Sequence, residues 1–362
     1  MAGGSLTVSQ LQDLLETTEY KLGSPRFHQM IQKETFYEIG DRYVKKSAKD
    51  MHFGAGDAIK EFLQIKQTAN LVDETDLFAD DNIQIVNTMD TIEVPWKHRT
   101  TAIGWERREL LMNKGRARLI NLMKTRRSKM LIDMIEKFEY EFFSAPLASG
   151  DRKIYGVPAW VLWNATEGFY GDDPANITTG AGGLSIATYP NWANYTRTYA
   201  AISEDDLLTE MIQTADDIGF RAPIDVEDMV VGSGKRQRFY TTQTVRRGIE
   251  VLGRQRNDNL GVEIARYRNQ MVFQGTPILG LPILEHAADW SLPIPAAPVY
   301  CLNMDTFYPV FLEGDYIQQS STRPHPGKHN VLVQFYDTTY NMICTNRRMN
   351  AVIATGTGSQ AT

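Results

Sequence analysis

The sequence lacks the basic excess and the cysteine content that mark two common classes of protein. Lys and Arg number 38 against 44 Asp and Glu, so the formal net charge is -6. Because dedicated nucleic-acid binders carry a strong positive charge, this class is disfavoured. The only two cysteines, Cys301 and Cys344, are too few for a disulfide framework. We expect two buried thiols in a reducing compartment.

Long apolar runs are also missing. No run of about 18 apolar residues is present to span a membrane. The first residues, Met1 to Ser5, lack the basic and apolar regions of a secretion signal. We therefore expect a soluble, intracellular product without a membrane partner. A chain of 362 residues with 42% hydrophobic content can hold about two domains, each with a core.

The longest regular pattern runs from Glu106 to Phe143 and predicts one long helix with a single apolar stripe. It contains no proline, and Ser144-Ala145-Pro146 provides a stop. Gly115 is expected to loosen the first turns. The apolar stripe consists of Leu119, Leu122, Met123, Met130, Met134, Ile135, Phe138 and Phe142. Only this stripe can be buried, so we expect a strut to which other elements attach.

A change of period before this helix predicts two strands. Apolar residues alternate with threonines between Asn82 and Trp105. We expect a long hairpin whose tip is Pro95 to Arg99. An ordinary solvated turn is the alternative, but a Trp on an exposed hairpin is more economical when a neighbouring molecule covers it. The residues predicted to make this contact are Ile92, Val94, Trp96, Lys97 and Arg99.

The segment before the hairpin has too little apolar surface to form a domain. Residues 5 to 23 predict one short amphipathic helix ending at Gly23, and Pro25 to Asn70 keep a weakly helical pattern. We expect residues 1–70 to form an N-terminal arm that lies across something else.

The chain after the long helix predicts a loop followed by an α/β region. Tyr155 to Leu162 predict a short strand, and Asn164 to Tyr195 a long irregular glycine-rich loop. Helix and strand patterns then alternate from about 199 to 300, which predicts a separate domain. Later elements in this part are a helix capped at Ser203 and ended by Gly219, a strand at Asp228 to Val231, a helix through Tyr240, Val245 and Ile249, a strand at Val299 to Asn303, an element at Phe307 to Leu312, and two β-like runs at Val331 to Tyr336 and Tyr340 to Thr345.

Motifs that would indicate an enzyme or a metal site fail on their residue types. Gly232 to Lys235 follows a predicted strand, but a phosphate-binding loop needs another Gly at 229 and Ser or Thr at 236. His325 and His329 flank Pro326-Gly327, which favours a turn with solvated histidines. The paired aspartates suit loops and helix starts. We therefore predict no catalytic residue, no cofactor and no metal.

The order of these elements resembles the major capsid proteins of tailed bacteriophages, whose fold is also used by encapsulins. The resemblance rests on the hairpin running into the long helix and on three local patterns. These are Asp228-Met-Val-Val-Gly232 before a helix, Gly275-Thr-Pro-Ile-Leu-Gly-Leu-Pro-Ile283, and Phe311-Leu-Glu-Gly-Asp-Tyr316 before the closing strands and Arg347-Arg348. Two features depart from the pattern: the uncharged run Val331 to Tyr336 and the length of the Asn164 to Tyr195 loop.

The resemblance implies an α+β capsid fold with five parts. They are an N-terminal arm (1–70), an extended hairpin loop (71–105), a peripheral domain with the spine helix and glycine-rich loop (106–198), an axial domain (199–325), and closing strands with a flexible tail (326–362). Arginines at 254, 256 and 266 would fall near the loop around the five- and six-fold axes, so Arg254, Arg256 and Arg266 are further predicted intersubunit contacts.

The implied function is a structural one. The resemblance implies self-assembly into pentamers and hexamers of an icosahedral phage head around double-stranded DNA, which is held without sequence specificity. Portal, scaffold or decoration proteins would be further partners, and the product would reside in the virion after assembly in the host cytoplasm. The alternative is an encapsulin-like compartment that stores a cargo enzyme. Some relatives join their subunits covalently through a lysine in this loop and a distant asparagine. Lys97 occupies a similar place, but no asparagine partner can be assigned, so we predict no crosslink.

Overall fold

A computed structural model describes residues 52–64, 89–112, 116–148, 150–219, 237–255, 272–273, 276–289 and 291–356. The fold is α+β, as predicted. The chain divides into two compact units, each built from separate stretches of sequence. Unit 1 contains the described residues within 52–55, 96–142 and 309–340. Unit 2 contains those within 56–95, 143–308 and 341–356.

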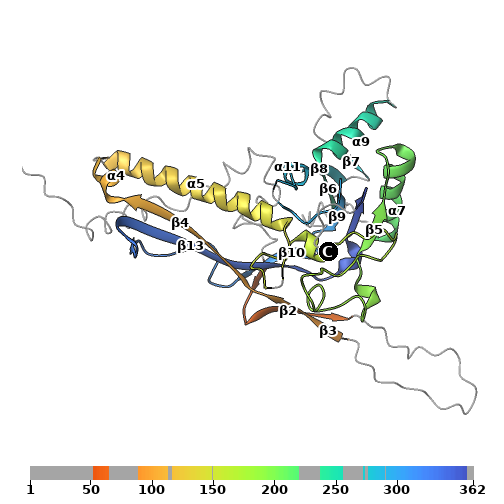
Figure 1. The fold of residues 1–362 in the computed structure, drawn as a ribbon, viewed down its shortest axis with the longest axis horizontal. Helices are drawn as coiled ribbons and strands as arrows, with labels where there is room; N and C mark the ends of the chain where they lie inside the picture. Colours follow the sequence, from red (N-terminus) through yellow and green to blue (C-terminus); the bar gives the residue numbers. More distant parts are fainter. Residues whose placement is uncertain are drawn as a thin grey trace, which may run out of the picture. The chain divides into compact units, whose positions relative to one another are not determined.

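Unit 1 is built around a long helix that lies along a sheet (Figure 1). The helices are α4 (Arg107–Met112) and α5 (Arg116–Phe142). The six-stranded sheet has β1, β10, β13 and β11 in that order, while β12 and β4 also pair with β13. Its strands are β1 (His52–Gly54), β4 (Lys97–Glu106), β10 (Phe307–Leu312), β11 (Gln318–Gln319), β12 (Arg323–His325) and β13 (Lys328–Cys344).

The apolar stripe of α5 packs on the face of the sheet formed by alternate residues of β4 and β13. Met130 and Leu131 of the helix join Ile103 and Trp105 of β4 in one buried cluster. Leu332 and Tyr336 complete it. Further along, the Phe138 ring stacks on the Tyr340 ring with centroids 4.9 Å apart. The predicted helix is therefore confirmed over 107–112 and 116–142, whereas Glu106 ends strand β4 and Gly115 lies outside the described residues.

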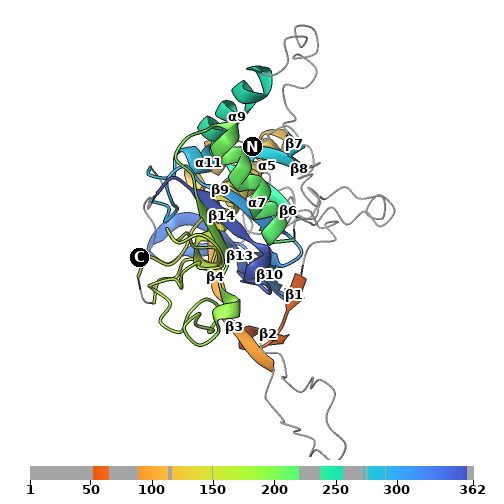
Figure 2. The same cartoon turned by 90° about the vertical axis from the view of Figure 1, so that its right-hand side faces the viewer.

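Unit 2 contains a mixed six-stranded sheet with two helices beside it (Figure 2). The strand order is β5 (Tyr195–Thr198), β14 (Ala351–Ala354), β9 (Val299–Asn303), β6 (Gln237–Thr241), β8 (Thr276–Gly280) and β7 (Val272–Phe273). Helices α7 (Thr209–Asp217) and α9 (Gln243–Gln255) share one core with the sheet. The shorter helical elements are α6 (Val157–Trp160), η1 (Pro190–Trp192), η2 (Glu204–Leu208), α11 (Pro282–Glu285) and η3 (Arg347–Met349).

Several predictions about unit 2 are confirmed. The hydroxyl of Ser203 accepts a hydrogen bond from the Asp206 amide at 3.2 Å, which caps the helical segment that begins there. Gly219 follows α7 with a φ of 65°. Strand β9 has the predicted bounds. The predicted loop is confirmed over 164–194, apart from η1 and single bridges, and Tyr195 begins β5.

The predicted hairpin between residues 82 and 105 is wrong in its pairing. Its two strands exist as β3 (Met89–Pro95) and β4. However, β3 pairs with β2 (Ala58–Gln64) and β4 pairs with β13. Strand partners are chosen by cross-strand packing, which a local pattern does not contain. The hairpin in this region is therefore β2–β3, and its connection at 65–88 lies outside the described residues.

Three other local predictions are corrected. Residues 157–160 form a helical turn, because a short apolar run fits a buried turn as well as a strand and Pro158 is favoured in a first turn. Tyr240 belongs to strand β6, and only the following residues are helical. Residues 52–64, predicted as weakly helical, contain two strands.

The two runs predicted after Val331 form one 17-residue strand, β13. The polar residues between them remain in the strand because β4 supplies partners. The hydroxyl of Thr100 donates a hydrogen bond to Asp337 at 2.7 Å. None of the described helices combines the length and the apolar character that crossing a membrane requires.

Candidate functional site

The β2–β3 pair, called the ribbon below, has one covered face and one open face. In its register Ile59 lies opposite Val94, and Phe62 opposite Thr91. Because side chains alternate along a strand, Ile59, Ile92 and Val94 share one face and Phe62 and Met89 the other. The first three are buried, with Ile92 and Val94 at 0% exposure. Phe62 is 72% exposed and Met89 57%.

The open face combines apolar side chains with an exposed ion pair. The Nζ of Lys60 lies 3.7 Å from Oε1 of Glu93 and 3.6 Å from Oδ1 of Asp57. Exposed pairs of this kind contribute about 0–1 kcal/mol to stability. Phe62 has the largest exposed fraction among the large hydrophobic side chains of the described chain. A face with this composition is typical of a surface that another molecule covers.

The covered face is fixed to the glycine-rich loop. The Glu93 amide donates a hydrogen bond to the Gly182 carbonyl at 2.9 Å. The hydroxyl of Tyr189 donates one to the carboxylate of Asp90, and this bond raises the pKa of Tyr189. At the end of the ribbon, the Asn341 side-chain amide donates to the Pro95 carbonyl at 2.7 Å. The part of β3 from Asp90 to Pro95, called the base of the ribbon below, therefore has polar contacts along its length.

Gly182 makes the closest approach between the loop and the ribbon. Its φ of 67° lies in the left-handed region that favours glycine. A Cβ atom at this position would lie 2.6 Å from Cγ2 of Ile92 and 2.8 Å from Cη2 of Trp160. Both separations are shorter than a normal carbon–carbon contact. Only glycine fits between the ribbon and the Trp160 ring.

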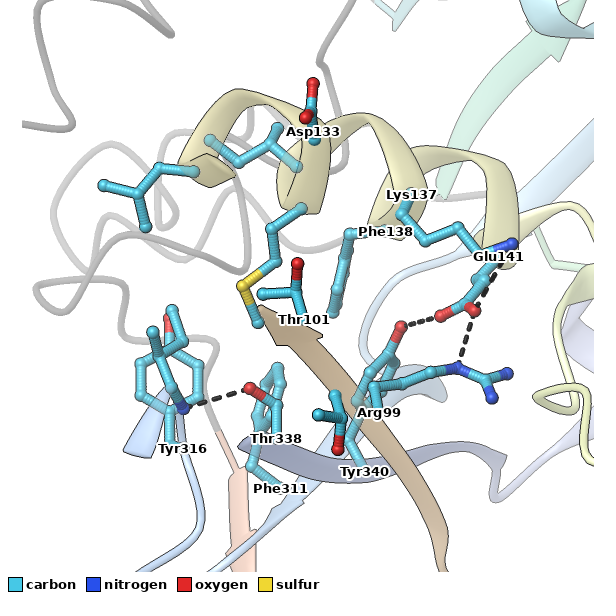
Figure 3. Close-up of a pocket in the computed structure, with 15 residues that line it drawn as sticks. Arg99, Thr101, Asp133, Lys137, Phe138, Glu141, Phe311, Tyr316, Thr338 and Tyr340 are labelled. Carbon is cyan, nitrogen blue, oxygen red and sulfur yellow. Dashed lines mark hydrogen bonds and ion pairs between the residues drawn. The ribbon is translucent and has the colours of Figure 1, made fainter. Parts of the chain in front are cut away.

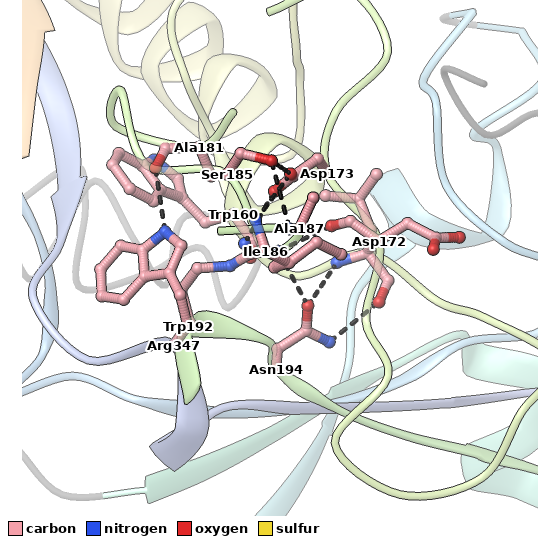
Figure 4. Close-up of polar contacts among 11 residues, drawn as sticks. Trp160, Asp172, Asp173, Ala181, Ser185, Ile186, Ala187, Trp192, Asn194 and Arg347 are labelled. Atoms are coloured by element: carbon pink, nitrogen blue, oxygen red, sulfur yellow. Dashed lines mark hydrogen bonds and ion pairs between the residues drawn. The ribbon is translucent and has the colours of Figure 1, made fainter. Parts of the chain in front are cut away.

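A fully buried arginine organises the loop that carries Gly182 (Figure 4). Arg347 has 0% exposure, and its Nε donates to the Trp160 carbonyl at 2.6 Å. Its Nη2 donates to the Asp172 carbonyl at 2.8 Å and to Oδ1 of Asn194 at 3.2 Å. Its Nη1 lies 3.4 Å from Oδ1 of Asp173. Burial lowers the pKa of Arg347, and the Asp173 carboxylate opposes this shift.

Asp173 contacts both Arg347 and the backbone of the loop. Its Oδ2 accepts hydrogen bonds from the hydroxyl of Ser185 and the amide of Ile186, both at 2.9 Å. The indole of Trp192 donates to the Ala181 carbonyl at 3.0 Å, next to Gly182. These contacts hold the segment 180–189 at Ala181, Ser185 and Ile186, so a loop without regular structure keeps a defined backbone.

A second buried charge lies in unit 1, where the end of α5 meets β4 and β13 (Figure 3). The side chain of Glu141 is 3% exposed, and its Oε1 lies 2.6 Å from Nε of Arg99. Its Oε2 accepts a hydrogen bond from the hydroxyl of Tyr340. Lys137, one helical turn earlier, is 3.8 Å away. The cluster borders a mostly apolar cavity of about 340 Å³, which Phe138, Phe311 and Tyr316 also line.

Burial controls the protonation of this cluster. It raises the pKa of Glu141 above its ordinary value, although Arg99, Tyr340 and Lys137 oppose the shift. Burial also raises the pKa of Tyr340 far above 10, and the Glu141 carboxylate adds to this. The cluster therefore ties the helix to both strands and carries a desolvation penalty on its carboxylate.

The residues predicted as intersubunit contacts do not form one projecting tip. Ile92 and Val94 are buried within the same chain, on the covered face of the ribbon. Lys97 and Arg99 belong to β4 in unit 1, and Arg99 binds Glu141. Trp96 is half-buried near Gly54. A contact between copies at these residues stays a prediction.

Of the predicted axial residues, Arg254 lies in the last turn of α9. Arg256 and Arg266 lie outside the described residues, as does the rejected phosphate-loop candidate at 232–235. The turn predicted at Pro326-Gly327 is confirmed, since it joins β12 to β13. Within the described chain no group of His, Cys, Asp or Glu is placed to hold a metal ion. Cys301 and Cys344 are buried free thiols, as expected.

Sequence reasoning missed the residues that build the ribbon's base. Phe62 was placed in a helical pattern, although Gly54 and Gly56 before it indicate a turn into a strand. Gly182 falls within the predicted glycine-rich loop, where nothing in the sequence separates it from its neighbours. Arg347 enters the sequence analysis only as part of the capsid resemblance, because an arginine is usually exposed and a single sequence does not reveal which one is buried.

Comparisons with known proteins bear on the fold. No protein-family model and no curated protein matches the sequence. Among solved structures, the chain resembles the cyanophage A-1(L) capsid, with a TM-score of 0.60 at 14% identity over 85% of this chain and 91% of that one. It also resembles the capsid of a native GTA particle, with a TM-score of 0.53 at 10% identity over 88% and 90% of the two chains. The chain therefore has the α+β fold of phage capsid proteins.

The Glu141 cluster predicts a specific dependence of stability on pH. Because the folded protein binds the Glu141 proton more tightly than the unfolded chain, this group contributes stability below its unfolded pKa of about 4.5. That contribution is lost as pH rises through the folded pKa. Urea unfolding from about pH 4.5 to about pH 8 should show wild type losing stability relative to Glu141→Gln. A difference that is constant with pH, or that grows in favour of wild type, would contradict this assignment.

The Arg347 contacts predict a large difference between two neighbouring arginines. Arg347→Met should lower the free energy of unfolding by about 3–5 kcal/mol, because it leaves Asp173, the buried Trp160 carbonyl and the buried Asn194 amide oxygen without their donor. Arg348→Met is the matched control. Arg348 is only half-buried, donates to Asn191 and stacks on Phe169, so its loss should be about 1 kcal/mol or less. Equal losses in the two variants would show that Arg347 does not organise the loop.

Proposed function

We propose that this chain is the major capsid protein of a tailed bacteriophage. It self-assembles into the pentamers and hexamers of an icosahedral head that encloses double-stranded DNA. The observation that carries the proposal is the fold shared with the cyanophage A-1(L) capsid over 85% of this chain and 91% of that chain. A match over nearly the whole of both chains favours a shell protein over a domain inserted into an enzyme, although fold alone does not fix function.

The shape of the ribbon supports an assembly role. A two-stranded sheet is marginally stable in water, and its open face exposes Phe62 and Met89. A neighbouring copy that covers this face removes apolar surface from water at roughly 25 cal/mol per Å². Closed symmetric assembly gives every copy the same cover at once. Many modest contacts then produce a rigid shell.

The proposed partners follow from the shell. The chain binds copies of itself, and the packaged DNA lies on the inner face without sequence-specific contacts, in keeping with a net charge of -6. Portal, scaffold or decoration proteins complete the particle. The product resides in the virion and is assembled in the host cytoplasm. In this role the chain is structural and catalyses no reaction.

Electron microscopy of the expressed, purified chain tests the proposal. We expect closed shells of uniform diameter built from pentamers and hexamers. A protein that stays a monodisperse, fully folded monomer at high concentration would contradict it. Shells that enclose a co-purifying enzyme cargo in the native host, instead of DNA, would support an encapsulin-like compartment against a phage head.

The open face of the ribbon predicts a selective assembly defect. Phe62→Ser should leave the urea midpoint of the dissociated protomer nearly unchanged, because Phe62 is 72% exposed there. It should reduce the fraction of protein in shells by about tenfold, since each lost apolar contact repeats in every copy. Phe62→Leu keeps an apolar side chain and should assemble nearly as well as wild type. Sedimentation velocity measures the fraction, and equal assembly of the Ser and Leu variants would exclude this face as an interface.

A further inference from the structure

The ribbon can make the same contact with a neighbour in every copy only if its direction relative to the rest of unit 2 is defined. Its strands are joined through 65–88, outside the described residues, and contacts at its base hold the described part of it within unit 2. Three of them involve the loop or the chain after it: Glu93 to Gly182, Asp90 to Tyr189, and Pro95 to Asn341. Two of the three come from one short segment, residues 180–189.

We propose that residues 180–189 act as a clamp that sets the direction of the ribbon and so positions its Phe62 and Met89 face against a neighbouring copy. The inference rests on the proposed function, and it adds the positioning residues Gly182 and Tyr189. Gly182 is the point of closest approach, because a Cβ atom there would collide with both Ile92 and the Trp160 ring. Tyr189 adds a hydrogen bond to Asp90 near the start of β3.

The clamp has two attachment points on the ribbon, and they restrain different motions. The Glu93 amide binds the Gly182 carbonyl near the end of β3. Asp90 binds Tyr189 about three residues earlier, or roughly 10 Å along an extended strand. One point alone would let a strand pivot, whereas two separated points fix both its position and its direction. The same segment supplies both points. The rigidity of this segment therefore determines how narrowly the direction of the ribbon is defined.

The rigidity of the segment comes from buried partners. Asp173 accepts hydrogen bonds from Ser185 and Ile186, in the middle of the segment. Trp192 binds the Ala181 carbonyl at its beginning. Arg347 lies near Asp173 and binds the carbonyl of Trp160, the residue whose ring packs against Gly182. The direction of the ribbon is thus linked through defined contacts to a fully buried charge.

Two adjacent glycines provide a matched test. Gly182 and Gly183 have φ angles of 67° and 83°, so an alanine at either position meets comparable left-handed backbone strain. At position 183 an added Cβ meets nothing within 4 Å, whereas at 182 it meets Ile92 and Trp160. Gly182→Ala therefore displaces the ribbon, and Gly183→Ala provides the control for backbone strain alone.

Hydrogen exchange of the dissociated protomer measures the clamp directly. Amides of residues 91–94 should exchange roughly tenfold faster in Gly182→Ala than in Gly183→Ala, while amides of the six-stranded sheet of unit 2 remain equally protected. Equal exchange of the ribbon in the two variants would overturn the proposal. This comparison decides whether the clamp exists even if wild type forms no shells, an outcome that would refute the proposed function.

Shell formation measures the consequence for assembly. If wild type and Gly183→Ala form closed shells of one diameter, Gly182→Ala should give roughly tenfold fewer closed shells, because the misdirection repeats in every copy. Closed shells of normal number and diameter would contradict the positioning role. If Gly182→Ala fails to fold, Tyr189→Phe decides: it removes the hydroxyl that donates to Asp90 and keeps the ring. It should broaden the diameter distribution relative to Tyr170→Phe, a control in the same loop whose side chain is exposed, and matching distributions would overturn the proposal.

Discussion

A two-stranded β-sheet buries too little surface to be stable alone, and the ribbon meets this constraint on one face only. Ile59, Ile92 and Val94 are buried within the same chain, against a loop that leaves no room for a side chain at 182. The opposite face exposes Phe62 and Met89. The chain thus covers one face of the ribbon itself. Assembly with a neighbouring copy would cover the other face. This asymmetry connects the local packing of unit 2 to the function proposed for the whole chain.

Both units use a buried charge where a helix or loop must be held at one position. Arg347 contacts four oxygen atoms around the glycine-rich loop, and Glu141 joins the end of α5 to β4 and β13. Buried ion pairs contribute little net stability compared with apolar packing, because desolvation offsets the attraction. They do specify geometry, since a misplaced partner leaves an unpaired charge. A shell protein needs such defined geometry, because small angular errors accumulate over many copies.

The sequence predicted the elements with strong local patterns and failed where long-range pairing decides. The apolar stripe of α5, the Ser203 cap and strand β9 follow from periodicity and capping, and the structure confirms them. The partner of β3 is β2, and no local signal distinguishes this pairing from one with β4. The resemblance to phage capsid proteins was right at the level of the fold.

The candidate site was harder to predict than the fold. Ile92 and Val94 were chosen because they are apolar and close to a turn, and the same apolar character placed them in the core of the ribbon. Phe62 was overlooked because Ala58 to Gln64 lacks the strict alternation of a half-exposed strand. The role of Gly182 depends on the ring of Trp160 and on Ile92, which lie far from it in sequence. Such contacts exist only in the folded chain.

Methionine oxidation tests most directly whether sister copies cover the ribbon. Met89 is 57% exposed on the open face, and Met349, at 39%, serves as a reference outside the ribbon. Wild-type protein would be treated with hydrogen peroxide as dissociated protomer and as assembled shell, and the sulfoxide at each methionine followed by mass spectrometry. The account predicts that Met89 oxidises readily in the protomer and is protected in the shell by about tenfold or more. Equal oxidation of Met89 in both forms would contradict it.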